Sequence, residues 1–136
     1  MSDATKLIAG LLLISVPTIE FGGTFLLRIL SGKHSEFTEF QRSMFRAGHA
    51  HAGVLVILAL VAQVFTDHAG LSVPIGWAVR IGFAAAPILV SGGFFGSALG
   101  KGRTRPGGLI GLLWIGVFVL GGALIVLGTG LIRARG

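Results

Sequence analysis

The chain contains no cysteine and no tyrosine, and only 12% of its residues are charged. Without cysteine the protein cannot form disulfides, hold a thiolate-ligated iron–sulfur cluster or bind zinc through thiolates. Soluble proteins carry about 25% charged residues, so the scarcity of charge argues against a soluble domain. Acidic residues are the rarest charged type, with five against eleven Lys and Arg.

Long apolar runs take the place of the missing charge. Hydrophobic residues make up 53% of the chain, and the mean hydropathy is +0.89. A helix needs about 20 apolar residues to cross a bilayer, and no alternating pattern typical of a membrane barrel is present. We therefore predict an all-α integral membrane bundle that forms one domain over residues 1–136. Its four transmembrane helices are expected at about residues 5–30, 45–66, 75–99 and 109–132.

The basic residues predict an orientation. The first apolar run is too long for the core of a signal peptide, so we expect it to remain as a helix, and four helices place both termini on one side. Seven basic residues lie in or beside the first and third loops, and four lie near the termini and the second loop. The first set is Arg28, Lys33, Arg42, Arg46, Lys101, Arg103 and Arg105; the second is Lys6, Arg80, Arg133 and Arg135. The positive-inside rule then places the termini outside, and the net charge of +6 is ascribed to lipid headgroups rather than to nucleic acid.

An internal repeat links the first and third predicted helices. "PTIEFGGTF" (residues 17–25) and "PILVSGGFF" (residues 87–95) both read Pro, four residues, Gly-Gly, one residue, Phe. Two helices per unit would make the copies parallel. Because Pro and Gly are frequent in membrane helices, a chance match is the alternative to two duplicated hairpins. If the duplication holds, the first hairpin is the specialised half, since the glutamate and the histidine pair occur only there.

Glu20 is the most informative single residue. It lies about 15 Å from the end of its predicted helix, near the middle of the membrane. Carboxyl groups at such depth usually face a bundle interior or an aqueous cavity with a partner. Pro17 before it and Gly22-Gly23 after it predict a bent helix around a polar site. The alternative is a protonated side chain bonded to a neighbouring carbonyl or hydroxyl.

The segment "RAGHAHAG" (residues 46–53) opens the second predicted helix. His49 and His51 are two residues apart, or about 200° around a helix, so they cannot chelate one metal ion together. Each can serve a different neighbour, either a flat ligand such as haem or a hydrogen bond between helices. Because the first two helices are antiparallel neighbours, Glu20 and one histidine are within reach, with Arg46 above them. Near the other membrane surface, Arg80 is expected either to reach headgroups or to pair with Asp67.

The "RAGHAHAG" segment resembles a group of small four-helix membrane proteins of high-GC bacteria, in which a comparable stretch begins the second helix. "VPTIEFGG" and "SGGFFG" fit the same group, so the resemblance covers most of the chain. It implies a multi-pass protein of the bacterial inner membrane and carries no assigned activity. His-x-His at a helix start is also similar to haem-copper oxidase relatives, whose other haem and copper histidines are missing here. "FRAGHAHAG" resembles a stretch of the membrane glutathione transferases, whose glutamate in the same helix is replaced here by an apolar residue.

Three functions stay open at this point. The leading prediction is a non-catalytic membrane subunit of a homo-oligomer or larger membrane complex, with an intramembrane polar site of Glu20, Arg46, His49 and His51. The alternative is a redox protein that binds haem or a metal such as copper through His49, His51 and Glu20. The third is a small proton-coupled transporter built on Glu20. No Walker, HExxH or GxSxG motif indicates phosphoryl transfer or hydrolysis, and whether the chain is an enzyme stays open.

Overall fold

A computed structural model describes residues 1–33 and 36–135, and the long elements in this part of the chain are four α-helices. They are α1 (Asp3–Arg28), α2 (Glu39–Thr66), α3 (Val73–Ser97) and α4 (Ile110–Arg133), and a π-helical turn, η1 (Ile29–Lys33), follows α1. Each of the four is long and apolar enough to cross a membrane. The predicted all-α, four-helix membrane architecture is thereby confirmed.

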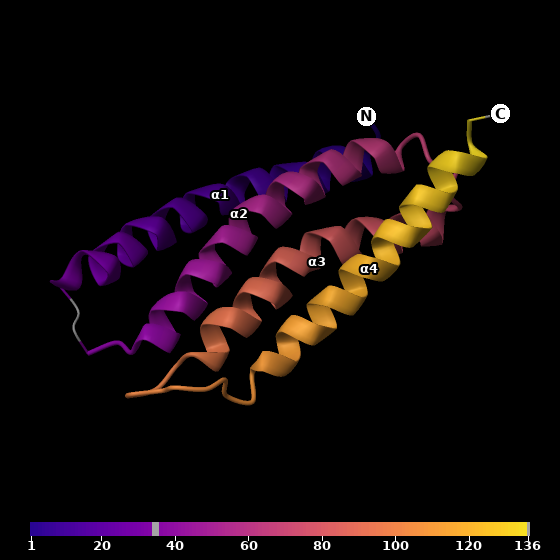
Figure 1. Ribbon diagram of the computed structural model, residues 1–136. Coiled ribbons are helices and arrows are strands. Elements are labelled where there is room, and N and C mark those ends of the chain that lie inside the picture. Colours follow the sequence, from indigo (N-terminus) through magenta and orange to yellow (C-terminus); the bar gives the residue numbers. More distant parts are fainter. Residues whose placement is uncertain (34–35, 136) are drawn as a thin grey trace.

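The helices lie side by side in chain order, and both termini are at the same end of the molecule (Figure 1). Each helix packs mainly against its neighbour in the sequence, most extensively α3 against α4 and α2 against α3. The helices α1 and α4 therefore form the two edges of a row. A row, unlike a closed bundle, leaves both of its broad faces open to the surroundings.

The start of α2 lies at Glu39 instead of near Phe45. Thr38 and Gln41 form a capping box, in which each side chain bonds the backbone N–H of the other residue. The added turns carry Phe40, which packs against a small apolar cluster formed with Phe45. An amphipathic loop segment and the second apolar run thus become one continuous helix.

The buried apolar side chains form two clusters with a layer of glycines between them. The larger cluster lies toward the termini and the smaller one, around Ile29 and Phe45, toward the loops. In the layer between, the glycines leave space that side chains or backbone of the neighbouring helix occupy. A Cβ atom on Gly48 would lie 2.9 Å from the Phe95 ring, and one on Gly93 would lie 2.4 Å from the backbone N of Leu113. Such approach is the known use of glycine in membrane helices.

The repeated Gly-Gly segments occupy similar places in the two hairpins. In the first, the Cβ position of Gly23 lies 3.1 Å from His49 of α2, the next helix. In the second, Gly93 meets Leu113 of α4, again the next helix. The duplication itself stays a prediction, but in both hairpins the second glycine of the pair receives a residue of the following helix.

Candidate functional site

His49 lies in the contact between α1 and α2. Its ring is half-buried and lies over Gly22 and Gly23, with Cε1 3.1 Å and Nε2 3.2 Å from the position of a Cβ on Gly23. The two glycines leave the space that the imidazole occupies. Of the two histidines, His49 is therefore the one that faces the helix bearing Glu20.

His51 lies on the other side of α2, against α3. Its ring centroid is 4.9 Å from that of Phe94, and its Nδ1 is 2.8 Å from the carbonyl oxygen of Ala47. Since a carbonyl oxygen only accepts, Nδ1 carries the proton in this bond. Nε2 is then the other ring nitrogen, on an exposed side chain. The two histidines face different neighbouring helices, as their spacing predicts.

Glu20 is exposed on α1, one helical turn before Gly23. Among the described residues it has no hydrogen bond or ion pair, so the expected contact with a histidine does not form within the chain. Arg46 does not join it either, because its side chain is 52% exposed and its Nη2 lies 3.5 Å from a carboxylate oxygen of Glu39. Of the four predicted residues, Arg46 thus lies in an exposed ion pair with Glu39 near the start of α2, and Glu20, His49 and His51 are separate polar groups deeper in the helices.

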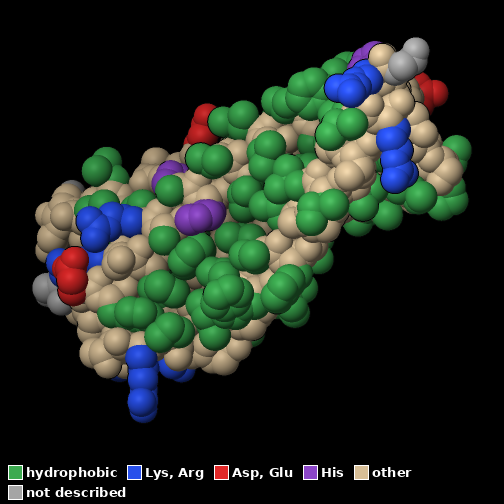
Figure 2. Space-filling model, turned by 45° about the vertical axis from the view of Figure 1, so that its right-hand side comes forward, with side chains coloured by type: hydrophobic (Ala, Val, Ile, Leu, Met, Phe, Trp, Pro, Cys, Tyr) green, Lys and Arg blue, Asp and Glu red, His purple; other side chains and the backbone are tan. Residues whose placement is uncertain are grey.

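Glu20, His49 and His51, together called the middle polar group, lie between the charged ends of the molecule. Figure 2 shows histidine side chains on one broad face, with an acidic side chain near them and basic side chains gathered toward both ends of the molecule. Within the described part of the chain, no group of three or more His, Asp and Glu could hold a metal ion. The middle polar group is therefore not a ligand set for a single ion in one chain.

A second polar cluster, at the end where the termini lie, is fully satisfied. Arg80 and Asp67, whose side chains are 7% and 12% exposed, form a 2.6 Å ion pair. The ion pair is made by Nη2 of Arg80. Nη1 of the same guanidinium donates to Thr5 Oγ1 at 2.6 Å and to the carbonyl oxygen of Gln63 at 3.0 Å. Ser2 donates to Asp67 through its backbone N and its hydroxyl, at 2.8 and 2.7 Å. We call these five residues the terminal network; they tie α1, α2 and α3 together.

The terminal network also sets the ionisation of Asp67. Burial opposes ionisation, but hydrogen bonds from Ser2, Thr5 and Arg80 outweigh it and hold the pKa of this carboxyl well below its usual range. Of the two roles expected for Arg80, pairing with Asp67 is the one observed. Thr5 and Gln63 were not anticipated, because a lone polar residue in an apolar run gives no sign of its partner. The only available signal was that all of these residues lie at the same end of their helices.

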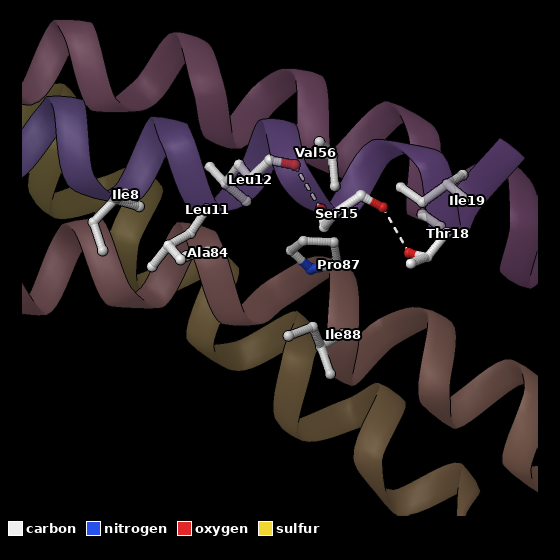
Figure 3. A pocket seen from close by; sticks show the side chains of 11 residues that line it. Ile8, Leu11, Leu12, Ser15, Thr18, Ile19, Val56, Ala84, Pro87 and Ile88 are labelled. Atoms are coloured by element: carbon white, nitrogen blue, oxygen red, sulfur yellow. Dashed lines mark hydrogen bonds between the residues drawn. The ribbon is translucent and has the colours of Figure 1, made fainter.

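A groove of about 390 Å³ is lined by residues of α1, α2 and α3, whose side chains are drawn in Figure 3. Ala52 and Val56 of α2 also line it, and the lining is apolar except for Ser15 and Thr18. Both hydroxyls donate to carbonyl oxygens of α1 itself, each at 2.6 Å. Glu20 is not among the lining residues, so the groove does not supply the polar path that a transporter built on Glu20 would need.

Family models, curated protein sequences and solved structures give no match for this chain. The resemblance to small four-helix membrane proteins of high-GC bacteria therefore stays a prediction. The terminal network is satisfied within the chain, whereas Glu20 and His51 of the middle polar group are exposed.

Proposed function

We propose that the protein is a non-catalytic membrane subunit that assembles with other membrane-spanning chains through its middle polar group. The observation that carries the proposal is Glu20, an exposed carboxyl on a membrane-spanning helix with no partner among the described residues. Polar groups of this kind at mid-membrane are rare, and a charged one at the helix centre costs roughly 2.5–3.5 kcal/mol on insertion scales. Contact with another chain removes that cost by supplying a hydrogen-bond partner.

The loose packing of α1 supports the same proposal. Its buried residues are Thr5, Ile8 and Leu12, all near the N-terminus. From Leu13 to Arg28 the helix contributes no fully buried side chain, and Phe21 and Leu27 are 75% and 68% exposed. A helix edge with both apolar bulk and an unpaired carboxyl is suited to contact another protein rather than lipid alone.

The proposed location is a bacterial inner membrane, with both termini outside. Seven basic residues lie in or beside the loops that precede α2 and α4, against four on the terminal side. Under the positive-inside rule, the loops that precede α2 and α4 face the cytoplasm.

Native mass analysis after mild detergent extraction tests the proposal. The expected result is an assembly larger than the 14.1 kDa chain, either several copies or a complex with other membrane proteins. Glu20→Leu should reduce the assembled fraction, whereas the matched control Glu39→Gln, at the exposed start of α2, should leave it unchanged. A monomeric wild-type chain that co-purifies with no other protein would contradict the proposal.

A second candidate function, haem binding, is favoured by the arrangement of His51. The bond from Nδ1 to the Ala47 carbonyl leaves Nε2 as the free nitrogen, which is the arrangement of an imidazole that ligates iron. Phe94 lies beside the ring and the side chain is exposed. The absorption spectrum of the purified protein tests this candidate. A Soret band that is lost in His51→Ala and kept in His49→Ala would support it, and a colourless preparation from haem-supplemented cells would exclude it.

A further inference from the structure

We propose that the partner at the middle polar group is a second copy of this chain in the same orientation, with Glu20 of each copy paired to His51 of the other. This inference rests on the proposed assembly function and adds to it the partner and the contact. The two copies would meet through the exposed side of α2 between His49 and His51, where Ala47, Ala50 and Gly53 lie. We call this surface the α2 outer face.

Glu20 and His51 lie at the same depth in the membrane. The contact between Gly23 and His49 fixes the register of α1 against α2. Glu20 lies three residues before Gly23 on α1, and His51 lies two residues after His49 on α2. Because the two helices are antiparallel, both steps lead in the same direction along the membrane normal. At 1.5 Å per residue, these steps differ by only about 1.5 Å. In an interface between two copies that lie at the same depth in the membrane, Glu20 of one copy can therefore meet His51 of the other.

A two-fold axis along the membrane normal preserves depth and exchanges the two sides of the α2 outer face. Glu20 lies beyond one edge of that face, on α1, and His51 lies at the other edge, against Phe94 of α3. Rotation by 180° therefore brings each Glu20 opposite the partner subunit's His51. One interface forms two equal pairs, as expected of an isologous contact.

The two groups complement each other chemically. The His51 ring keeps one proton on Nδ1 for Ala47, so its Nε2 can accept a second. The Glu20 carboxyl can carry that proton, and a single proton between the two groups gives either an O–H to nitrogen bond or an N–H to carboxylate bond. Two groups that are exposed within one chain would thus satisfy each other in the dimer.

The shape of the α2 outer face allows the second copy to approach. Ala50 is exposed, and a Cβ added at Gly53 would meet no described atom within 4 Å. Residues this small let helix backbones come close in a membrane. The pairing of Glu20 with His51 determines how the two copies are oriented. The small residues allow the helix backbones of the two copies to come close enough for these pairs to form.

Cysteine cross-linking in native membranes tests the proposed interface, and the absence of natural cysteine makes single-cysteine variants clean. Ala50→Cys should form a disulfide-linked dimer under a mild oxidant, because it lies near the two-fold axis. The matched control is Ile115→Cys on α4, which is 54% exposed and lies at a similar depth, since neighbouring Leu113 contacts Gly93 and Gly116 contacts Leu89. The control should remain monomeric under the same conditions.

A charge swap tests the pairing itself. Glu20→His and His51→Glu alone each place like groups opposite one another, and each should weaken dimerisation by about tenfold. In the double variant, the histidine at position 20 faces the glutamate at position 51 of the partner, so each pair is restored. Its cross-linking and native mass should therefore return to near the wild-type level. Helical circular dichroism of every variant checks that the chain still folds.

The outcomes separate this inference from the proposed function. A wild-type chain that is monomeric and without partners overturns both. A larger assembly in which Ala50→Cys does not cross-link, or in which the double variant stays as weak as the single ones, overturns the second-copy inference alone. In that case the chain would assemble through a different surface or with a different membrane protein.

Discussion

The terminal network and the middle polar group contain similar chemical groups in opposite states. In the terminal network, the side chains of Arg80 and Asp67 are only 7% and 12% exposed, and hydrogen bonds join them to each other and to residues of neighbouring helices. In the middle polar group, Glu20 and His51 are exposed on membrane-spanning helices and do not pair within the described chain. The difference indicates that the first cluster holds the fold together and the second is available for contact with something outside the chain.

The two hairpins differ in a related way. Gly23 of the first receives the side chain of His49, whereas Gly93 of the second receives Leu113, including its backbone. The first contact places a polar ring between two helices, and the second is a tight apolar contact. The second hairpin is thus built for packing, and the first keeps polar groups at the same kind of position.

Removing Arg80 is expected to have the largest effect. Arg80→Met leaves Asp67 partly buried without its cation, and breaking such a pair costs about 3–5 kcal/mol in unfolding free energy. Thermal or SDS unfolding of the detergent-solubilised protein measures the loss. The double variant Arg80→Met/Asp67→Leu should recover much of it, because no unpaired charge remains. A single variant within about 0.5 kcal/mol of the wild type would show that the terminal network does not hold the fold, since such a change is typical of surface sites.

Glycine-to-alanine substitutions compare the two hairpins. Gly93→Ala should destabilise by about 2–3 kcal/mol, because the added methyl meets the backbone of Leu113 at 2.4 Å. Gly23→Ala should cost less, since it meets only the His49 ring at 3.1 Å, and a ring can turn aside. Gly10→Ala is the control within α1, where a Cβ meets no described atom within 4 Å. Equal effects at Gly93 and Gly23 would contradict the difference drawn between the hairpins.

Acidification should destabilise the protein through the terminal network, by a smaller amount than the substitutions above. The pKa of Asp67 is depressed in the folded protein, so the unfolded chain binds a proton first and stability falls as pH decreases. The full contribution is present above the unfolded pKa of about 3.9 and is lost as pH falls through the lower, folded value. Unfolding midpoints measured from pH 6 downward should decline below about pH 4 in the wild type. Asp67→Asn should remove most of this decline, and a wild-type midpoint that rises on acidification would have the wrong sign.

Glu20→Gln is expected to have the smallest effect on the stability of the monomer. Glu20 has no partner among the described residues, so the unfolding free energy in a detergent that dissociates assemblies should change by less than about 0.5 kcal/mol. The same variant should lower the assembled fraction in mild detergent. A large loss of monomer stability would show that Glu20 has a role inside the fold and would remove the contrast between the two polar clusters.

The candidate site could be predicted from the sequence only in part. The spacing of His49 and His51 is enough to place them on different sides of α2, since helical geometry is local. Which of them faces α1 depends on how α1 and α2 pack, and that is decided by the space above Gly22 and Gly23. The pairing of Glu20 with a histidine was expected from depth alone, and within one chain it does not form because Glu20 is exposed on α1.

The number of helices and their apolar character follow from the sequence by itself, because a bilayer demands long apolar segments with internally bonded backbones. The start of α2 at Glu39, six residues before the expected boundary, follows from a local capping box. Tertiary structure alone decided which polar residues meet. Thr5, Gln63, Asp67 and Arg80 are far apart in the chain and come together only because three helices pack side by side. The same packing leaves Glu20 and His51 exposed, since a row of helices cannot enclose residues on its open faces.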